Sequence, residues 1–133
     1  MVEIVELKGL EKFDGKIVDI KSEEGEYGQQ YIIKIEPLDK TLIKKGKTGA
    51  FWNYLKVSDN SDEKTLVKDS VLEKYCSAIC KVDSEMKKVL EKSTVPEFMV
   101  RTKGRSYTFN KEVLGKAFEG HEARTVWTPI KKL

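Results

Sequence analysis

Residues 51–56 alternate two kinds of side chain in a pattern that could place a ligand-binding row on one side of a β-strand. The two alternating sets are Trp52, Tyr54 and Lys56, and Phe51, Asn53 and Leu55. Successive side chains of a strand point to opposite faces, so one set must face the core and the other must face solvent. If Phe51 and Leu55 are buried, Trp52 and Tyr54 are exposed beside a lysine and can stack on flat rings such as nucleobases. The alternative is that Trp52 and Tyr54 fill the core, since large aromatic side chains are usually buried.

Two residues from the preceding strand and turn could extend this row. Lys34 would lie next to the outward face of residues 51–56, although a lysine on a strand can also serve only to protect a sheet edge. Tyr27 occupies a turn tip between Gly25 and Gly28, where a small polar residue is more usual. An aromatic side chain at such a tip suits a contact with a ligand or partner.

The remaining candidate residues are basic or aromatic and lie later in the chain: Lys47, Lys56, Arg101, Arg105, Tyr107, Arg124 and Trp127. Arginine both pairs with phosphate and stacks on bases. For Trp127, a place in the core is the favoured alternative.

Charge is unevenly distributed along the chain, although the net charge is only +3. Residues 1–28 hold eight acids against four lysines, whereas residues 40–56 hold five lysines and no acid. Residues 99–111 are also free of acids and carry Arg101, Lys103, Arg105 and Lys111. If the basic segments converge they form a groove for a polyanion, and if they scatter they are ordinary solvated loops.

The elements that must position these residues are mainly strands. Residues 13–20 and 30–36 predict two strands joined by a turn at Gly25 and Gly28, which tolerate a positive φ. Pro37 ends the second strand, because proline cannot donate to a ladder. Residues 50–57 and 125–130 predict two more strands, and the proline in the last one indicates an edge or an end.

One strong helical signal covers residues 70 to about 92, where apolar side chains recur every three or four positions. Ser70 and Glu73 fit a capping box, and Asp83 followed by Ser84 could restart a second helix. Pro96 excludes continuation of this helix past Thr94. Residues 98–109 then predict an extra β-hairpin around residues 103–105, while residues 113–118 suit a helical turn or a strand.

Several classes of function lack support in the sequence. With the single histidine, His121, and no neighbouring nucleophile motif, no catalytic triad is identifiable, and no phosphate-binding glycine loop is present. Cys76 and Cys80 share one helix face and suit buried apolar positions better than a metal or redox site. We therefore expect no enzyme activity, no metal and no cofactor.

No apolar run approaches the roughly 18 residues of a membrane span and no signal peptide opens the chain. We therefore expect an intracellular, cytoplasmic protein without a membrane partner.

The layout resembles the oligonucleotide/oligosaccharide-binding (OB) fold of single-stranded DNA-binding proteins, in the manner of archaeal replication protein A domains and small phage or viral proteins. The resemblance is carried by residues 13–20, 27–35, Trp52, 114–118 and 127–131, with the helix between the third and fourth strands. The extra hairpin at 98–109 and the absence of a zinc ribbon depart from that family.

The resemblance implies one mainly β domain over residues 1–133: a five-stranded Greek-key barrel with one or two helices, an N-terminal extension at residues 1–12 and the extra hairpin. It also implies binding of single-stranded nucleic acid, DNA rather than RNA, with little sequence preference and a place in DNA replication. The stacking positions of the family carry over to Trp52, Tyr54 and Lys34. Partners would include replication proteins or further copies of the chain. Two alternatives remain open: a protein-interaction module on the same fold, and an enzyme with an unrecognised site.

Overall fold

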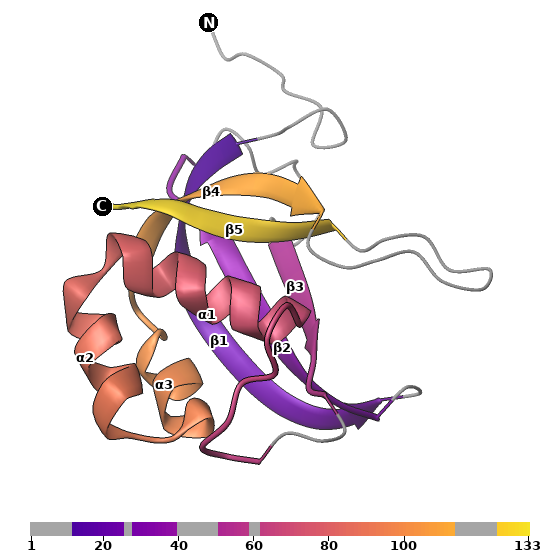
Figure 1. The fold of residues 1–133 in the computed structure, drawn as a ribbon. Coiled ribbons are helices and arrows are strands. Elements are labelled where there is room, and N and C mark those ends of the chain that lie inside the picture. Colours follow the sequence, from indigo (N-terminus) through magenta and orange to yellow (C-terminus); the bar gives the residue numbers. More distant parts are fainter. Residues whose placement is uncertain (1–11, 26–27, 40–50, 59–61, 114–124) are drawn as a thin grey trace, which may run out of the picture.

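The computed structural model describes residues 12–25, 28–39, 51–58, 62–113 and 125–133. These residues form one five-stranded antiparallel sheet and three helices, so the protein is mainly β as predicted, with one helix more than expected. The elements are β1 (Lys12–Gly25), β2 (Gly28–Pro37), β3 (Phe51–Lys56), α1 (Val71–Val82), α2 (Ser84–Lys92), α3 (Val95–Arg101), β4 (Ser106–Val113) and β5 (Thr125–Lys132). Figure 1 shows α1 lying across the sheet, with α2 and α3 grouped to one side.

The long strand β1 organises the sheet, whose strand order is β3-β2-β1-β4-β5. From Gly15 onward β1 pairs with β2, and its first five residues, Lys12 to Lys16, pair with β4 on the other side. The register to β2 shifts between Ile17 and Asp19, which marks a bulge. A bulge bends its strand and strengthens the local twist, so β1 can serve both halves of a curved sheet.

Gly15 lies where β1 is paired on both sides, opposite Pro37 of β2 and Tyr107 of β4. A Cβ atom at this position would lie 2.6 Å from the ring of Phe13 and 2.8 Å from the side chain of Ile35. Such distances are well inside van der Waals contact. Only glycine therefore fits without displacing core side chains.

The two edges of the sheet approach each other but do not pair. The side-chain amide of Asn53 on β3 donates to the carbonyl of Trp127 on β5 at 2.8 Å and accepts from the N–H of Trp127 at 2.8 Å. Beside it, the ring of Phe13 stacks on Phe51 at 4.1 Å and meets the edge of Trp127 at 4.9 Å. No backbone ladder joins β3 to β5 among the described residues, so five antiparallel strands are confirmed and closure into a barrel is not.

Local capping signals explain the first two helices. Ser70 accepts a hydrogen bond from the N–H of Glu73 at 3.2 Å, which confirms the predicted N-cap. The reciprocal half of the capping box is not formed, because the N–H of Ser70 donates to the carbonyl of Val67 and the carboxylate of Glu73 accepts from Ser77. Asp83 then breaks the helix and caps α2 by accepting from the N–H of Met86 at 3.3 Å. The predicted restart at Asp83 and Ser84 is confirmed.

The predicted hairpin over residues 98–109 is wrong, because its first half is helical. Thr94 caps α3 by accepting from the N–H of Glu97 at 3.3 Å, and Pro96 lies in the first turn. Proline ends a preceding helix, but its fixed φ also suits the start of the next one. Gly104, at φ +89°, lies in the turn after α3. The second half is a strand, β4, which pairs with β1 and β5.

Other predictions have mixed outcomes. The last strand is confirmed as β5, and its place at the edge of the sheet accommodates Pro129. The N-terminal extension, except for Lys12, and the late strand at residues 114–118 lie outside the described residues. Among the helices of the described segments, none has the length and apolar character needed to cross a membrane.

Candidate nucleic-acid interface

The outward side of β3 carries the aromatic pair. Phe51, Asn53 and Leu55 are buried, whereas 41% of Trp52 and 44% of Tyr54 is exposed. Two exposed rings on the same side of one strand form an apolar patch, and such patches can mark a ligand or partner site. The first of the two orientations left open by the sequence is therefore the observed one.

Neighbouring strands extend this surface through their register. Lys34 and Ile32 of β2 lie directly opposite Trp52 and Tyr54, and Lys21 of β1 lies opposite Ile32. Directly opposed residues of an antiparallel pair share one face of the sheet. We call this surface the aromatic face, and its residues are Lys21, Ile32, Lys34, Trp52, Tyr54 and Lys56.

The aromatic face combines flat rings with positive charge. The ammonium group of Lys34 lies 5.6 Å from the centroid of the Trp52 ring, within the range of a cation–π contact. This contact places a positive charge over the ring of Trp52. By the same register, Asp19 and Glu23 of β1 lie opposite Lys34 and Gln30, so their carboxylates are on this side of the sheet as well and reduce its net positive charge.

The spacing of the two rings limits what can stack on them. Residues two apart in a strand are separated by roughly 6.8 Å, about twice the 3.4 Å between successive bases of a DNA strand. Trp52 and Tyr54 can therefore meet neighbouring bases only if those bases are unstacked from each other. The geometry suits an extended single strand and not a duplex, whose bases are stacked and paired.

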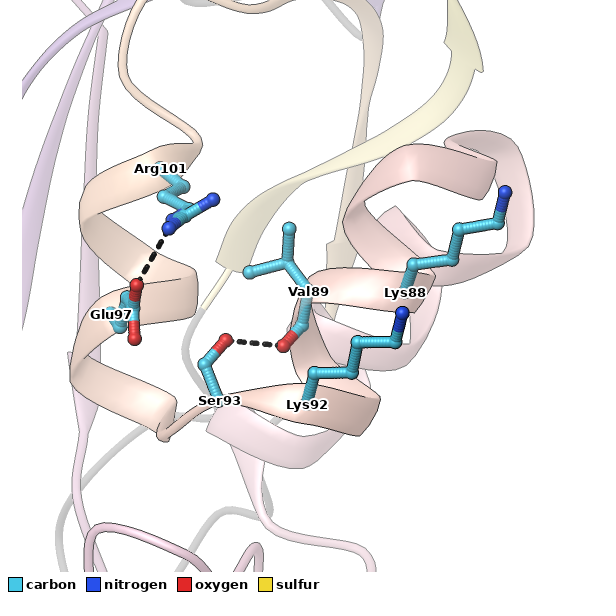
Figure 2. Close-up of a pocket in the computed structure, with 6 residues that line it drawn as sticks. All are labelled: Lys88, Val89, Lys92, Ser93, Glu97 and Arg101. Atoms are coloured by element: carbon cyan, nitrogen blue, oxygen red, sulfur yellow. Dashed lines mark hydrogen bonds and ion pairs between the residues drawn. The ribbon is translucent and has the colours of Figure 1, made fainter.

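Arg101 is not part of the aromatic face. It lies on α3, where its guanidinium pairs with Glu97 at 2.8 Å with both side chains largely exposed. Figure 2 shows this pair at a shallow pocket of about 300 Å³ between α2 and α3. Lys88 and Lys92 also line the pocket, but they extend on the far side of Val89 and do not converge on Arg101. A surface pair of this kind is weak, and the carboxylate of Glu97 offsets the charge of Arg101.

Arg105 and Tyr107 belong to an internal polar cluster around Asp83. The carboxylate of Asp83 is fully buried and accepts hydrogen bonds from Tyr107 Oη at 2.6 Å and Arg105 Nη1 at 2.9 Å. Arg105 Nη2 also pairs with Glu85 at 2.9 Å. Tyr107 is itself fully buried, which corrects the prediction that its ring contacts a ligand, because no face of the ring is open.

The electrostatics of this cluster favour the ionised carboxylate. Burial disfavours the charge of Asp83, but the hydrogen bonds from Tyr107 and Met86 and the charges of Arg105 and Lys132 outweigh it and lower its pKa. Burial and the bond to Asp83 raise the pKa of Tyr107, so this hydroxyl keeps its proton. The cluster ties the α1–α2 junction to β4 and β5.

The remaining candidates lie in the core or outside the described residues. Trp127 is half-buried and its ring packs against Phe13 and Phe51, in agreement with a core position. Tyr27, Lys47 and Arg124 lie outside the described residues.

The cysteines and metal-binding residues give no second site. Cys76 is buried and its sulfur lies 3.9 Å from that of Met99, while burial raises the pKa of the Cys76 and Cys80 thiols. Within the described segments, no three potential metal ligands come together.

Three residues that shape the interface are not among those predicted from the sequence. Ile32 carries neither a ring nor a charge that would mark it, and the place of Lys21 depends on the register between β1 and β2, which the sequence does not give. Asn53 could have been found as a polar residue at an inward position of an otherwise apolar alternation. Such a residue must find hydrogen-bond partners inside the fold.

Comparison with models of known protein families, with curated proteins and with solved structures finds no match to this chain.

Proposed function

We propose that this protein binds single-stranded nucleic acid, DNA in preference to RNA, through the aromatic face. The observation that carries the proposal is the exposure of Trp52 and Tyr54, 41% and 44%, at alternate positions of one strand. Stacking of a base on an aromatic side chain contributes about 1–3 kcal/mol and tolerates any base. Low sequence preference follows, because rings and lysines recognise features that all nucleotides share.

The proposed scaffold is a partly open OB-like barrel. Three features support it: the strand order β3-β2-β1-β4-β5, the contact between the edges at Asn53 and Trp127, and the helix α1 between β3 and β4. In barrels of this kind the outer surface of the second and third strands is a common place for oligonucleotides. The aromatic face occupies this place.

Electrostatic attraction adds a moderate contribution. The aromatic face holds three lysines, Lys21, Lys34 and Lys56, against the bordering carboxylates of Asp19 and Glu23. Each phosphate neutralised on a single strand contributes about −0.7 to the slope of log affinity against log salt, so three contacts predict a slope of about −2. A much steeper slope would indicate that basic residues outside the described segments also take part.

The test uses fluorescence with Trp52 as the reporter. The chain has two tryptophans, so Trp127→Phe leaves Trp52 as the only one. We expect a mixed-sequence single strand of about 12 nucleotides to quench Trp52, within the usual site size of such folds. The quenching should weaken as salt is added, and the matching duplex should have little effect.

Substitutions in the otherwise native chain complete the test, with anisotropy of a labelled oligonucleotide as the measurement. Trp52→Ala should weaken binding by more than about tenfold, as expected for loss of one stacked base. Val100→Ala is the matched control, because Val100 is 62% exposed but lies on α3. Unchanged affinity in a folded Trp52→Ala protein would remove Trp52 from the site. No binding of either nucleic acid, with salt-insensitive self-association, would instead favour a protein-interaction module.

A further inference from the structure

We infer that Asn53 is a positioning residue for the aromatic face, which fixes the two stacking rings by joining the free edges of the sheet. Asn53 lies between Trp52 and Tyr54 in the chain, but its side chain points to the opposite side and is 1% exposed. Because neighbouring side chains of a strand alternate, whatever holds Asn53 inward also holds both rings outward. This inference rests on the proposed function.

The amide of Asn53 links β3 to β5, between which the described residues form no backbone ladder. It offers a donor group, the NH₂, and an acceptor oxygen, the same two kinds of group that a peptide offers. Both are used by a single residue of β5, through the N–H and C=O of Trp127 at 2.8 Å each. A residue with only a donor, only an acceptor or neither cannot make both bonds.

β3 depends on this contact because it is short and lies at an edge. It has six residues, and among the described residues its backbone ladder runs to β2 alone. Edge strands with unpaired groups on one side open readily. The packing of Phe51 against Phe13 and Trp127 holds one end of β3, and the Asn53 bonds hold its middle.

A fixed strand favours binding because the rings need not be ordered when the ligand arrives. Immobilising side chains or loops on binding opposes affinity, and a site that is already rigid avoids this loss. Loss of the Asn53 bonds should therefore weaken nucleic-acid binding even though Asn53 faces away from the ligand.

The first test compares Asn53→Leu, which has a similar size but no hydrogen bonds, with Asp83→Asn, which disturbs the helix–sheet junction and leaves β3 untouched. Hydrogen exchange of the Trp127 amide, measured without nucleic acid, should accelerate more than that of the other β5 amides in Asn53→Leu, whereas in Asp83→Asn any acceleration should be shared equally along β5. Affinity for oligothymidine should fall by about tenfold, the size of one lost stacking contact, in Asn53→Leu and stay within about twofold in Asp83→Asn.

Equal losses of affinity in both variants would assign the effect to general destabilisation and overturn the inference. Unchanged affinity in Asn53→Leu, beside a clear loss in Trp52→Ala, would overturn it as well while leaving the proposed function intact. If Trp52→Ala also has no effect the proposed function fails, and the exchange of the Trp127 amide still decides whether Asn53 holds the edges together.

A rescue experiment covers the case in which Asn53→Leu does not fold. In Asn53→Asp the ionised carboxylate lacks a donor, whereas the protonated acid again has one donor and one acceptor. Burial raises the pKa of such a carboxyl, so affinity for oligothymidine should recover between about pH 7.5 and about pH 5 in this variant and not in the native chain. The nearby hydroxyl of Tyr75 stays neutral in this range, because burial raises its pKa. Absence of recovery would overturn the role of the paired donor and acceptor.

Discussion

Replacing Asp83 with asparagine tests how the helices are held on the sheet. One carboxylate oxygen, Oδ2, accepts from both Tyr107 and Arg105, and the other caps α2 through the N–H of Met86. Asparagine has the same shape but only one acceptor oxygen. Its NH₂ group must face either Arg105 and Tyr107 on one side or the N–H of Met86 on the other. In both orientations a donor of the asparagine side chain meets a donor of the protein.

The expected loss of stability follows from these contacts. Hydrogen bonds to a charged group contribute about 1.5–3 kcal/mol each, and breaking a buried ion pair costs about 3–5 kcal/mol. Arg105 is 26% exposed and keeps its pair with Glu85, so the loss of its bond to Asp83 lowers the free energy of unfolding by an amount at the low end of these ranges. Tyr107 is fully buried and contributes more. We expect Asp83→Asn to lower the free energy of unfolding by about 3 kcal/mol, within the range for a disrupted buried pair.

Urea denaturation followed by circular dichroism measures this loss. With a slope of about 2 kcal/mol per molar urea, the midpoint should fall by about 1.5 M. Because the native pKa of Asp83 is lowered, its contribution is present above the unfolded value of about 3.9 and is lost as the pH falls through the native pKa. The difference between the native chain and Asp83→Asn should therefore be full at neutral pH and shrink in acid.

A loss below about 1 kcal/mol at neutral pH, the contribution of one ordinary hydrogen bond, would refute this role of Asp83. A difference that stays constant from neutral pH into acid would also refute it, since it would show that ionisation of Asp83 is not involved. Tyr107→Phe gives the matched partner: in a double-mutant cycle its effect should largely disappear once Asp83 is already replaced.

Three further outcomes follow from the same structure. Gly15→Ala should destabilise the fold by about 1–3 kcal/mol, measured by urea denaturation, because the added methyl group overlaps Phe13 and Ile35; an unchanged midpoint would show that the sheet relaxes there. Oligothymidine should bind more tightly than oligoadenosine in anisotropy titrations, because its bases unstack easily and the rings of Trp52 and Tyr54 require unstacked bases. Lys34→Met should weaken binding by about threefold to tenfold and make the salt dependence shallower by about 0.7, whereas an unchanged slope would show that Lys34 meets no phosphate.

Local sequence signals determined much of this fold because they act over a few residues. The cap at Ser70, the helix restart at Asp83 and the strand alternation at residues 51–56 all agree with the structure. The same kind of signal at Thr94 and Pro96 also specifies α3. The predicted hairpin over residues 98–109 is wrong because a proline that ends one helix can also begin the next.

The tertiary structure alone decided which of these elements form a site. Alternation is symmetric, so the choice between Trp52 and Phe51 as the outward residue depends on what packs behind β3. The buried hydroxyl of Tyr107 bonds to Asp83, which is 24 residues away in the sequence, and Asn53 bonds to Trp127, which is 74 residues away. Such pairings depend on how the whole chain is brought together, because the free energy of burying a polar group is set by partners that are distant in sequence. The sequence therefore determined which side chains could stack on a base, and the fold decided that Trp52 and Tyr54 are open and that Tyr107 is not.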